Sequence, residues 1–151
     1  MKDNIWVSKD EMRALFPHHE VESSLSAVTS AQRLLIVEDD PDIARLLEYM
    51  LQDAGYQTSV AGSAAQAKTL LATQAFDGMT LDIGLPGQNG MTFLNELREQ
   101  PETQNLPVVI VSAFPDKVKN DLSRDTADTT AWIQKPIDLQ MLISRLAQAL
   151  R

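Results

Sequence analysis

The sequence predicts an α/β domain in which a doubly wound, five-stranded parallel sheet is covered by helices on both faces. Two observations support this prediction. Short apolar runs alternate with longer helix-like segments five times within residues 33–151, and in all but the fourth of these segments apolar residues recur every three or four positions. The apolar runs are almost uninterrupted, as in Val108-Val109-Ile110-Val111, which is typical of strands buried on both faces. Parallel strands joined through helices take right-handed crossovers, so helices are expected on both sides of the sheet.

The expected elements follow one another in strict alternation. We expect strands at 33–38, 57–60, 78–82, 107–112 and 132–134. Helices are expected at 43–54, 64–74, 90–100, 117–123 and 139–150, and the fourth is the weakest because its segment is polar and poorly periodic. Gly55 stands where the first helix should end, and Pro101 is expected to end the third.

Composition and charge exclude several classes of function. The 151 residues, with 44% apolar and 23% charged, are ordinary for one globular domain. Thirteen Lys and Arg against 21 Asp and Glu give a formal charge of −8, so we expect no direct binding to nucleic acid. The absence of Cys excludes disulfides and thiol catalysis. No apolar run approaches the roughly 20 residues that cross a bilayer, and no export signal is apparent, so we expect no membrane association and a cytoplasmic location.

Residues 1–32 differ in character from residues 33–151. We expect an N-terminal arm with a short helix and a linker before the α/β domain. Ser8 and Glu11 fit a capping box, and the residues around them include several large apolar side chains, among them Trp6 and Phe16. An arm with so much apolar surface is expected to dock on its own domain, on a second copy or on a partner, which leaves a homodimer open.

The residues able to do chemistry follow the predicted strands. Ligands bind outside the carboxyl ends of the strands of an open parallel sheet. The residues at these ends are Glu38, Asp39, Asp82, Ser112 and Lys135. Three carboxylates at one edge repel one another, and a hard divalent cation such as Mg²⁺ relieves that repulsion. A carboxylate nucleophile, Mg²⁺, an ammonium group and a hydroxyl are together suited to moving a phosphoryl group onto Asp.

Several of these residues also have a purely structural interpretation. Asp40 followed by Pro41 is typical of a helix N-cap with Pro at the first helical position, and we favour that role for Asp40. Asp82 alone could start a turn, and Ser112 alone is uninformative. Their conjunction with a Lys at one edge of the sheet favours the phosphoryl-transfer interpretation.

Residues 33–151 resemble a response-regulator receiver domain of the CheY-like superfamily, which acts in two-component signalling. Four motifs in the order and spacing of that family support the resemblance: VEDD at 37–40, LDIGLPGQNG at 81–90, VIVSA at 109–113 and WIQKP at 132–136. The resemblance implies a flavodoxin-like sheet with the strand order 2-1-3-4-5.

The resemblance implies that Asp82 is the phosphoacceptor. A histidine kinase, a phosphotransfer protein or a small phosphodonor would supply the phosphoryl group. Glu38, Asp39 and Asp82, together with the backbone carbonyl of Gly84, would hold Mg²⁺, or Mn²⁺ in its place.

The resemblance also implies residues that respond to phosphorylation. Ser112 would move onto one phosphoryl oxygen and Lys135 would pair with another, across a Lys135–Pro136 bond that is typically cis in the family. Trp132 matches an aromatic residue that swings inward and reshapes the face formed by the fourth helix, the fifth strand and the fifth helix, where a downstream protein would bind. The family usually has Tyr or Phe there, so we expect either that the larger indole of Trp132 reaches the inward state less fully or that the switch works differently.

The chain is therefore expected to be a signalling domain and not an enzyme, one that catalyses only its own phosphorylation and a slow dephosphorylation. Gly84 and Phe114 occupy the positions that tune phosphoryl lifetime in the family, and neither orients a water molecule. One alternative, a phosphohydrolase with an Asp nucleophile, needs a second Asp where Gly84 stands. The other alternative is a receiver-like module that binds partners without phosphorylation, and no feature of the sequence favours it.

Overall fold

The computed structural model describes residues 31–113 and 130–150. The chain divides into two units, Met1–Ala31 and Gln32–Arg151, and almost all the described residues belong to the second unit. The helix expected in the N-terminal arm and the weak helix expected at 117–123 lie outside the described residues.

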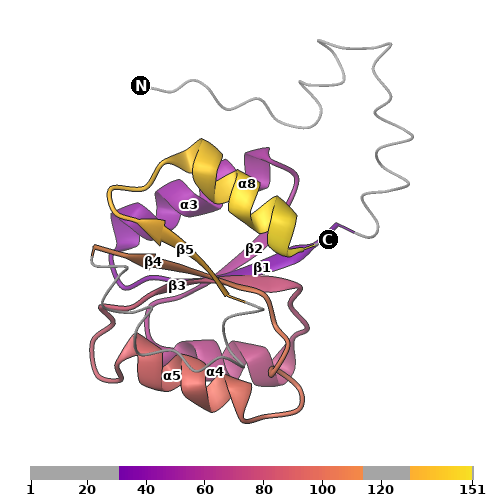
Figure 1. Cartoon of the computed structure of the whole chain (residues 1–151), viewed down its shortest axis with the longest axis vertical. Coiled ribbons are helices and arrows are strands. Elements are labelled where there is room, and N and C mark those ends of the chain that lie inside the picture. Colours follow the sequence, from indigo (N-terminus) through magenta and orange to yellow (C-terminus); the bar gives the residue numbers. More distant parts are fainter. Residues whose placement is uncertain (1–30, 114–129, 151) are drawn as a thin grey trace. The chain divides into compact units, whose positions relative to one another are not determined.

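A parallel sheet forms the centre of the second unit, as the sequence predicts (Figure 1). Its strand order, β2-β1-β3-β4-β5, is the one that the resemblance implied. Every neighbouring pair of strands is parallel. The strands within the described residues are β1 (Arg33–Val37), β2 (Gln57–Ala61), β3 (Gly78–Asp82), β4 (Val108–Ser112) and β5 (Thr130–Gln134).

Helices cover both faces of this sheet (Figure 1). The helices within the described residues are α3 (Pro41–Asp53), α4 (Ala64–Thr73), α5 (Gly90–Arg98) and α8 (Leu139–Ala149). Leu47 of α3 and Leu142 of α8 share one apolar cluster, and Ala67 of α4 and Phe93 of α5 share the other. The domain is therefore doubly wound, with α3 and α8 on one face and α4 and α5 on the opposite face.

The central strands are apolar on both sides because both sides are covered. Along β1, Leu35 and Val37 contribute to the cluster beneath α4 and α5, whereas Leu34 and Ile36 contribute to the cluster beneath α3 and α8. All four side chains are buried. Continuous apolar runs therefore predict the interior of this sheet correctly, and polar side chains concentrate where the strands end.

Most element boundaries lie within one or two residues of those expected, and two of the differences have a clear physical reason. Helix α5 ends at Arg98, before Pro101, because the chain passes into turns at Glu99, whose N–H donates to the carbonyl oxygen of Glu96. Strand β5 begins at Thr130, two residues before the expected start. Thr130 and Ala131 pair with Val108 and Val109 of β4, and this tertiary pairing extends the strand beyond the short run at 132–134 that the sequence indicated.

All four described helices begin at the carboxyl edge of the sheet, and each has a polar N-cap. Asp40 accepts hydrogen bonds from the backbone N–H groups of Asp42 and Ile43, which confirms its predicted capping role. Ser63, Asn89 and Asp138 cap the other three helices. Within the part of the chain that the structure describes, no helix has the length and apolar character to cross a membrane.

Candidate functional site

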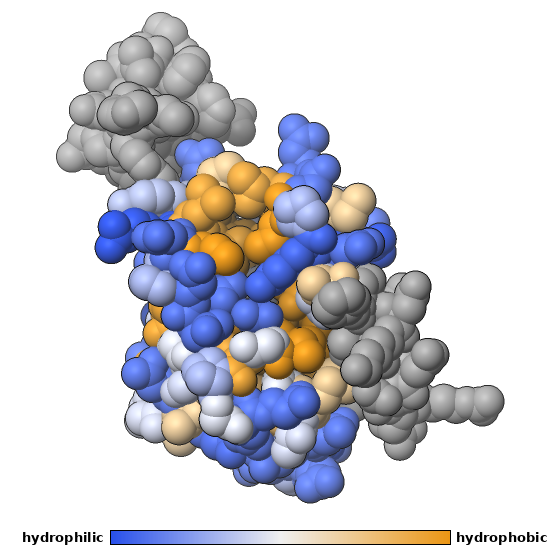
Figure 2. All heavy atoms as spheres, turned by 90° about the vertical axis from the view of Figure 1, so that its left-hand side faces the viewer, coloured by the Kyte–Doolittle hydropathy of each residue, from blue (hydrophilic) through white to orange (hydrophobic). Residues whose placement is uncertain are grey.

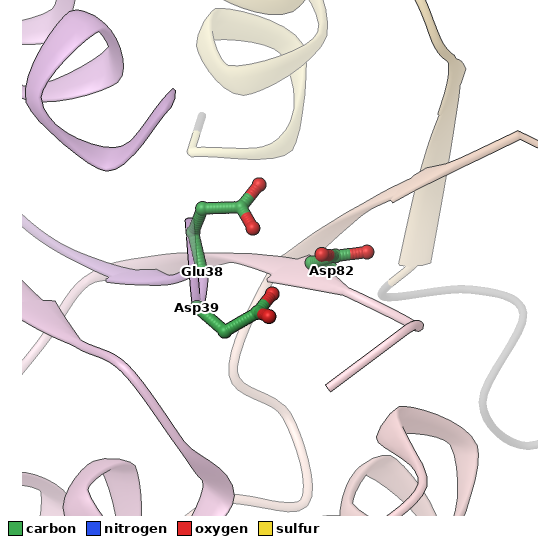
Figure 3. Close-up of side chains that lie close together, drawn as sticks. All are labelled: Glu38, Asp39 and Asp82. Carbon is green, nitrogen blue, oxygen red and sulfur yellow. The ribbon is translucent and has the colours of Figure 1, made fainter. Parts of the chain in front are cut away.

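Three carboxylate side chains meet at the carboxyl edge of the sheet. Figure 2 shows this edge face-on, with hydrophilic residues across its middle and apolar residues above and below. Glu38 and Asp39 directly follow β1, and Asp82 is the last residue of the adjacent strand β3 (Figure 3). Each of the three offers an oxygen atom, and these atoms lie within 4.8 Å of one another. The structure thus brings together the three acids that the sequence singled out.

Glu38 is buried although it carries an ionisable group. Its side chain is only 3% exposed, and its Oε2 accepts a hydrogen bond of 3.2 Å from the backbone N–H of Asp40. The pKa of the Glu38 carboxyl is raised from its ordinary 4.5 to about 7, first by burial and then by a hydrogen bond with the Asp82 side chain, while the Asp40 N–H and the charge of Lys135 oppose the shift. Without a bound metal ion, Glu38 is therefore only partly ionised at neutral pH, even with the Lys135 ammonium group nearby.

Asp82 is buried at the end of β3, where its carboxylate is held by the next turn. Its Oδ1 accepts a hydrogen bond of 3.0 Å from the backbone N–H of Gly84. The interpretation of Asp82 as the start of a turn is therefore correct, and it is compatible with membership of the acid cluster. The bond orients the carboxylate at the surface of the sheet edge.

Lys135 supplies the positive charge that faces the acids. Its Nζ lies 3.4 Å from Oδ2 of Asp82 and 3.8 Å from Oε1 of Glu38. The backbone N–H of Lys135 donates a 2.9 Å hydrogen bond to the carbonyl oxygen of Ser112, which places Lys135 directly beyond the end of β4. The Lys135–Pro136 peptide bond is cis.

Ser112 and Trp132 lie beside the acid cluster rather than within it. Ser112 is buried at the end of β4, and its backbone is joined to Lys135 as described above. Trp132 pairs with Ile110 in the sheet, is half-buried, and packs against the apolar cluster beneath α4 and α5. The structure therefore shows one position of the indole, in contact with the core.

The donor set fits a hard divalent cation. Carboxylate and carbonyl oxygens are the ligands that Mg²⁺ prefers, and Mg²⁺ usually binds one or two protein carboxylates and keeps several waters. Asp39 is exposed at the rim of the cluster, whereas Glu38 and Asp82 are buried. Three acids packed this closely carry negative charge that Lys135 offsets only in part, so a cation at this position would stabilise the folded protein.

The sequence did not indicate two features of the site. One is the N–H of Asp40, which hydrogen-bonds the Glu38 carboxylate in addition to the capping role of the Asp40 side chain. The other is Gly90, the first residue of α5, whose Cα lies against the backbone of Asp82 and Ile83. Gly90 stood within the motif at 81–90, but neither periodicity nor charge distinguishes a glycine that is needed for a close backbone contact.

Comparison with known proteins gives a consistent result. A family model described as the response regulator receiver domain matches residues 34–147. The DNA-binding response regulator MtrA of Mycolicibacterium smegmatis is 32% identical over 123 residues, which are 82% of this chain and 52% of MtrA. The alginate biosynthesis transcriptional regulatory protein AlgB of Pseudomonas putida is 36% identical over 124 residues, 82% of this chain and 27% of AlgB. The chain thus spans about half, or less, of the length of these curated relatives.

Solved structures show the same fold. The crystal structure of a sensor protein from Polaromonas sp. JS666 matches with a TM-score of 0.73 and 41% sequence identity, over 79% of this chain and 95% of that chain. The receiver domain of the sensor histidine kinase PA1611 from Pseudomonas aeruginosa PAO1 matches with a TM-score of 0.65 and 25% identity, over 80% and 98% of the two chains. That receiver domain has a magnesium ion coordinated in its active site cleft.

Proposed function

Because the chain belongs to the response regulator receiver domain family of two-component signalling, we propose that Asp82 accepts a phosphoryl group in a Mg²⁺-dependent reaction. The donor would be a histidine kinase or a phosphotransfer protein. The observation that carries this proposal is the position of the Asp82 carboxylate, which lies within 4.8 Å of oxygen atoms of Glu38 and Asp39 and 3.4 Å from the ammonium group of Lys135.

The proposed reaction is a displacement at phosphorus. A carboxylate oxygen of Asp82 forms a new O–P bond, and the P–N bond of the donor phosphohistidine, or the P–O bond of acetyl phosphate, breaks. The electron pair of the broken bond stays with the leaving imidazole or acetate. The product is an acyl phosphate on Asp82, and no oxidant or reductant is needed.

The surrounding side chains stabilise charge at the phosphorus. Glu38 and Asp39 would hold Mg²⁺ together with Asp82, and the carbonyl of Gly84 is a further oxygen at the same edge. The bound Mg²⁺ would neutralise negative charge on the phosphoryl oxygens. Lys135 lies within reach of one of those oxygens, since its Nζ already contacts the Asp82 carboxylate, and the Ser112 hydroxyl would move to another.

The proposed output is a phosphorylation-dependent change in protein binding. Movement of Ser112 would open space for Trp132, and the surface around β5 and α8 would change its shape. The fourth helix expected on this surface lies outside the described residues. Cytoplasmic action and the absence of direct nucleic acid contact remain predictions from composition, and MtrA, a longer relative, is a DNA-binding protein.

Intact mass spectrometry tests the proposal. We expect wild-type protein incubated with acetyl phosphate and Mg²⁺ to gain the mass of one phosphoryl group, and Asp82→Asn to gain none. EDTA should prevent the gain. If the wild type gains no mass and also binds no beryllofluoride, the module that acts without phosphorylation becomes the better explanation.

A further inference from the structure

Helix α5 begins at Gly90, which packs directly on the backbone that carries Asp82. The N–H of Gly90 donates a hydrogen bond of 3.2 Å to the carbonyl oxygen of Ile83. A Cβ atom added at position 90 would lie 2.8 Å from Cα of Ile83 and 2.9 Å from the carbonyl oxygen of Asp82. Real Cβ atoms do not approach backbone atoms this closely. The first turn of α5 therefore reaches the end of β3 only because residue 90 has no side chain.

Helix α5 is anchored in the core close to this contact. Phe93 and Leu94 of α5 are completely buried, and the Oδ1 atom of Asn89 caps the helix by accepting a 2.7 Å hydrogen bond from the N–H of Met91. Withdrawal of α5 would open a gap in a close-packed core. Gly84, in contrast, is exposed at the edge of the sheet. A Cβ at position 90 would therefore press from an anchored helix on the backbone of Asp82 and Ile83, so the strain falls on the end of β3 and on the exposed residue that follows, Gly84.

We infer that Gly90 is a positioning residue for the phosphoryl-acceptor site. It sets how far the Asp82 carboxylate and the Gly84 carbonyl stand out from the sheet edge, and these two groups move together because the Gly84 N–H donates to Asp82 Oδ1. The inference rests on the proposed function of Asp82, whose geometry Gly90 controls. Restoring ordinary contact around an added Cβ requires a shift of roughly half an ångström, which is large for a cation-binding site.

The direct test is Gly90→Ala, with Gly78→Ala as the matched control. Gly78 begins the same strand at its opposite end, and a Cβ there would press on two side-chain methyl groups, 2.9 Å from Cδ2 of Leu150 and 3.2 Å from Cδ2 of Leu34. Both variants lose stability, but only Gly90→Ala stresses the Asp82 segment. We expect Gly90→Ala to bind Mg²⁺ about tenfold more weakly or worse, whereas Gly78→Ala keeps the wild-type affinity.

A second pair of variants makes the test independent of whether Gly90→Ala folds. Asn89→Ala adds no atom but releases the first turn of α5 from its cap, and Ser63→Ala removes the equivalent cap from α4. The two losses of capping energy should be similar. We expect Asn89→Ala to weaken Mg²⁺ binding and Ser63→Ala to leave it unchanged, because α4 follows β2, which β1 separates from the strand that carries Asp82.

Titration calorimetry with Mg²⁺ on folded protein and the NMR position of the Gly84 amide are the two readouts. The inference is supported if Gly90→Ala binds Mg²⁺ more weakly than the wild type and shows a shifted NMR signal of the Gly84 amide, while Gly78→Ala shows neither change. The inference would be overturned if Gly90→Ala and Gly78→Ala bind Mg²⁺ with equal affinity. If Gly90→Ala does not fold, equal affinities of Asn89→Ala and Ser63→Ala would overturn it. A wild type that binds Mg²⁺ but neither gains a phosphoryl group nor binds beryllofluoride would reject the proposed function, while these comparisons would still decide the role of Gly90.

Discussion

The Nζ atom of Lys135 lies 3.4 Å from Oδ2 of Asp82, although the two residues belong to the ends of strands that are not neighbours in the sheet. Strand β4 stands between them, so the long Lys side chain reaches across its end. The hydrogen bond from the Lys135 N–H to the Ser112 carbonyl fixes the backbone position from which this side chain extends. A cation placed in this way faces the position that a phosphoryl group on Asp82 would occupy.

Removal of this cation should slow phosphorylation. We expect Lys135→Ala to lower the rate of phosphoryl transfer from acetyl phosphate by about tenfold or more, because the developing charge loses a positioned ammonium group. Lys68→Ala is the matched control, since Lys68 is also paired with a carboxylate, Glu96 at 2.8 Å, but on the surface between α4 and α5. The rate is measured by mass spectrometry over time. Equal rates in the two variants would show that Lys135 has no part in the transfer.

The metal-free protein should lose stability as the pH rises from about 4.5 to 7. In this window the folded chain keeps a proton on Glu38, whose pKa is raised to about 7, whereas the unfolded chain has released it at its ordinary pKa of 4.5. The folded state therefore binds more protons, and the free energy of unfolding falls with rising pH, in total by roughly 3 kcal/mol for a shift of this size.

Urea unfolding in EDTA at several pH values measures this dependence. Glu38→Gln should flatten the profile between pH 4.5 and 7, because the amide does not titrate. A wild-type profile as flat as that of Glu38→Gln would contradict the prediction.

The acid cluster could be predicted from the sequence because parallel strands end at one edge, which places Glu38 and Asp82 together once both strands are recognised. The burial of Glu38 could not be predicted, since it depends on how α3 and α8 cover that face. The early start of β5 at Thr130 depends on pairing with β4, which residue preferences do not encode. The contact of Gly90 is between backbone atoms, and no pattern of side chains reports it.

Addition of Mg²⁺ should raise the melting temperature, because the ion binds the folded cluster and relieves repulsion among its carboxylates. At a Mg²⁺ concentration 100 times Kd the gain is about 2.7 kcal/mol. Asp39→Ala should lose most of this response. Asp42→Ala, which removes an exposed acid in the first turn of α3 outside the cluster, should keep it. Differential scanning calorimetry with and without Mg²⁺ measures the rise in melting temperature. A rise in Asp39→Ala as large as in the wild type would exclude Asp39 as a ligand.

Thr80 and Thr103 should respond in opposite directions to the same substitution. Both side chains are buried, but Thr80 Oγ1 has no hydrogen-bond partner among the described residues, whereas Thr103 Oγ1 donates a 2.6 Å bond to the carbonyl oxygen of Leu97. Thr80→Val removes an unpaired hydroxyl from the apolar interior and should stabilise the protein by about 1 kcal/mol. Thr103→Val breaks a buried hydrogen bond and should destabilise it by a similar amount.

Urea unfolding of the two Val variants beside the wild type measures both changes. Destabilisation by Thr80→Val would show that its hydroxyl is paired in solution, for instance with a buried water molecule.

A carboxylate at position 84 should shorten the life of the phosphoryl group. A Cβ at Gly84 would lie 3.7 Å from Oδ1 of Asp82, which is ordinary contact, so a side chain fits there and stands next to the acyl phosphate. Gly84→Asp would place a general base where it can orient and deprotonate an attacking water, and we expect dephosphorylation to accelerate about tenfold or more. Gly84→Ala adds the same Cβ without the carboxylate and should lose its phosphoryl group as slowly as the wild type.

The loss of the phosphoryl group is followed by intact mass after removal of acetyl phosphate. The samples start equally phosphorylated, so that slower phosphorylation of Gly84→Asp does not affect the comparison. Identical decay of Gly84→Asp and Gly84→Ala would show that a base at this position has no access to the phosphorus.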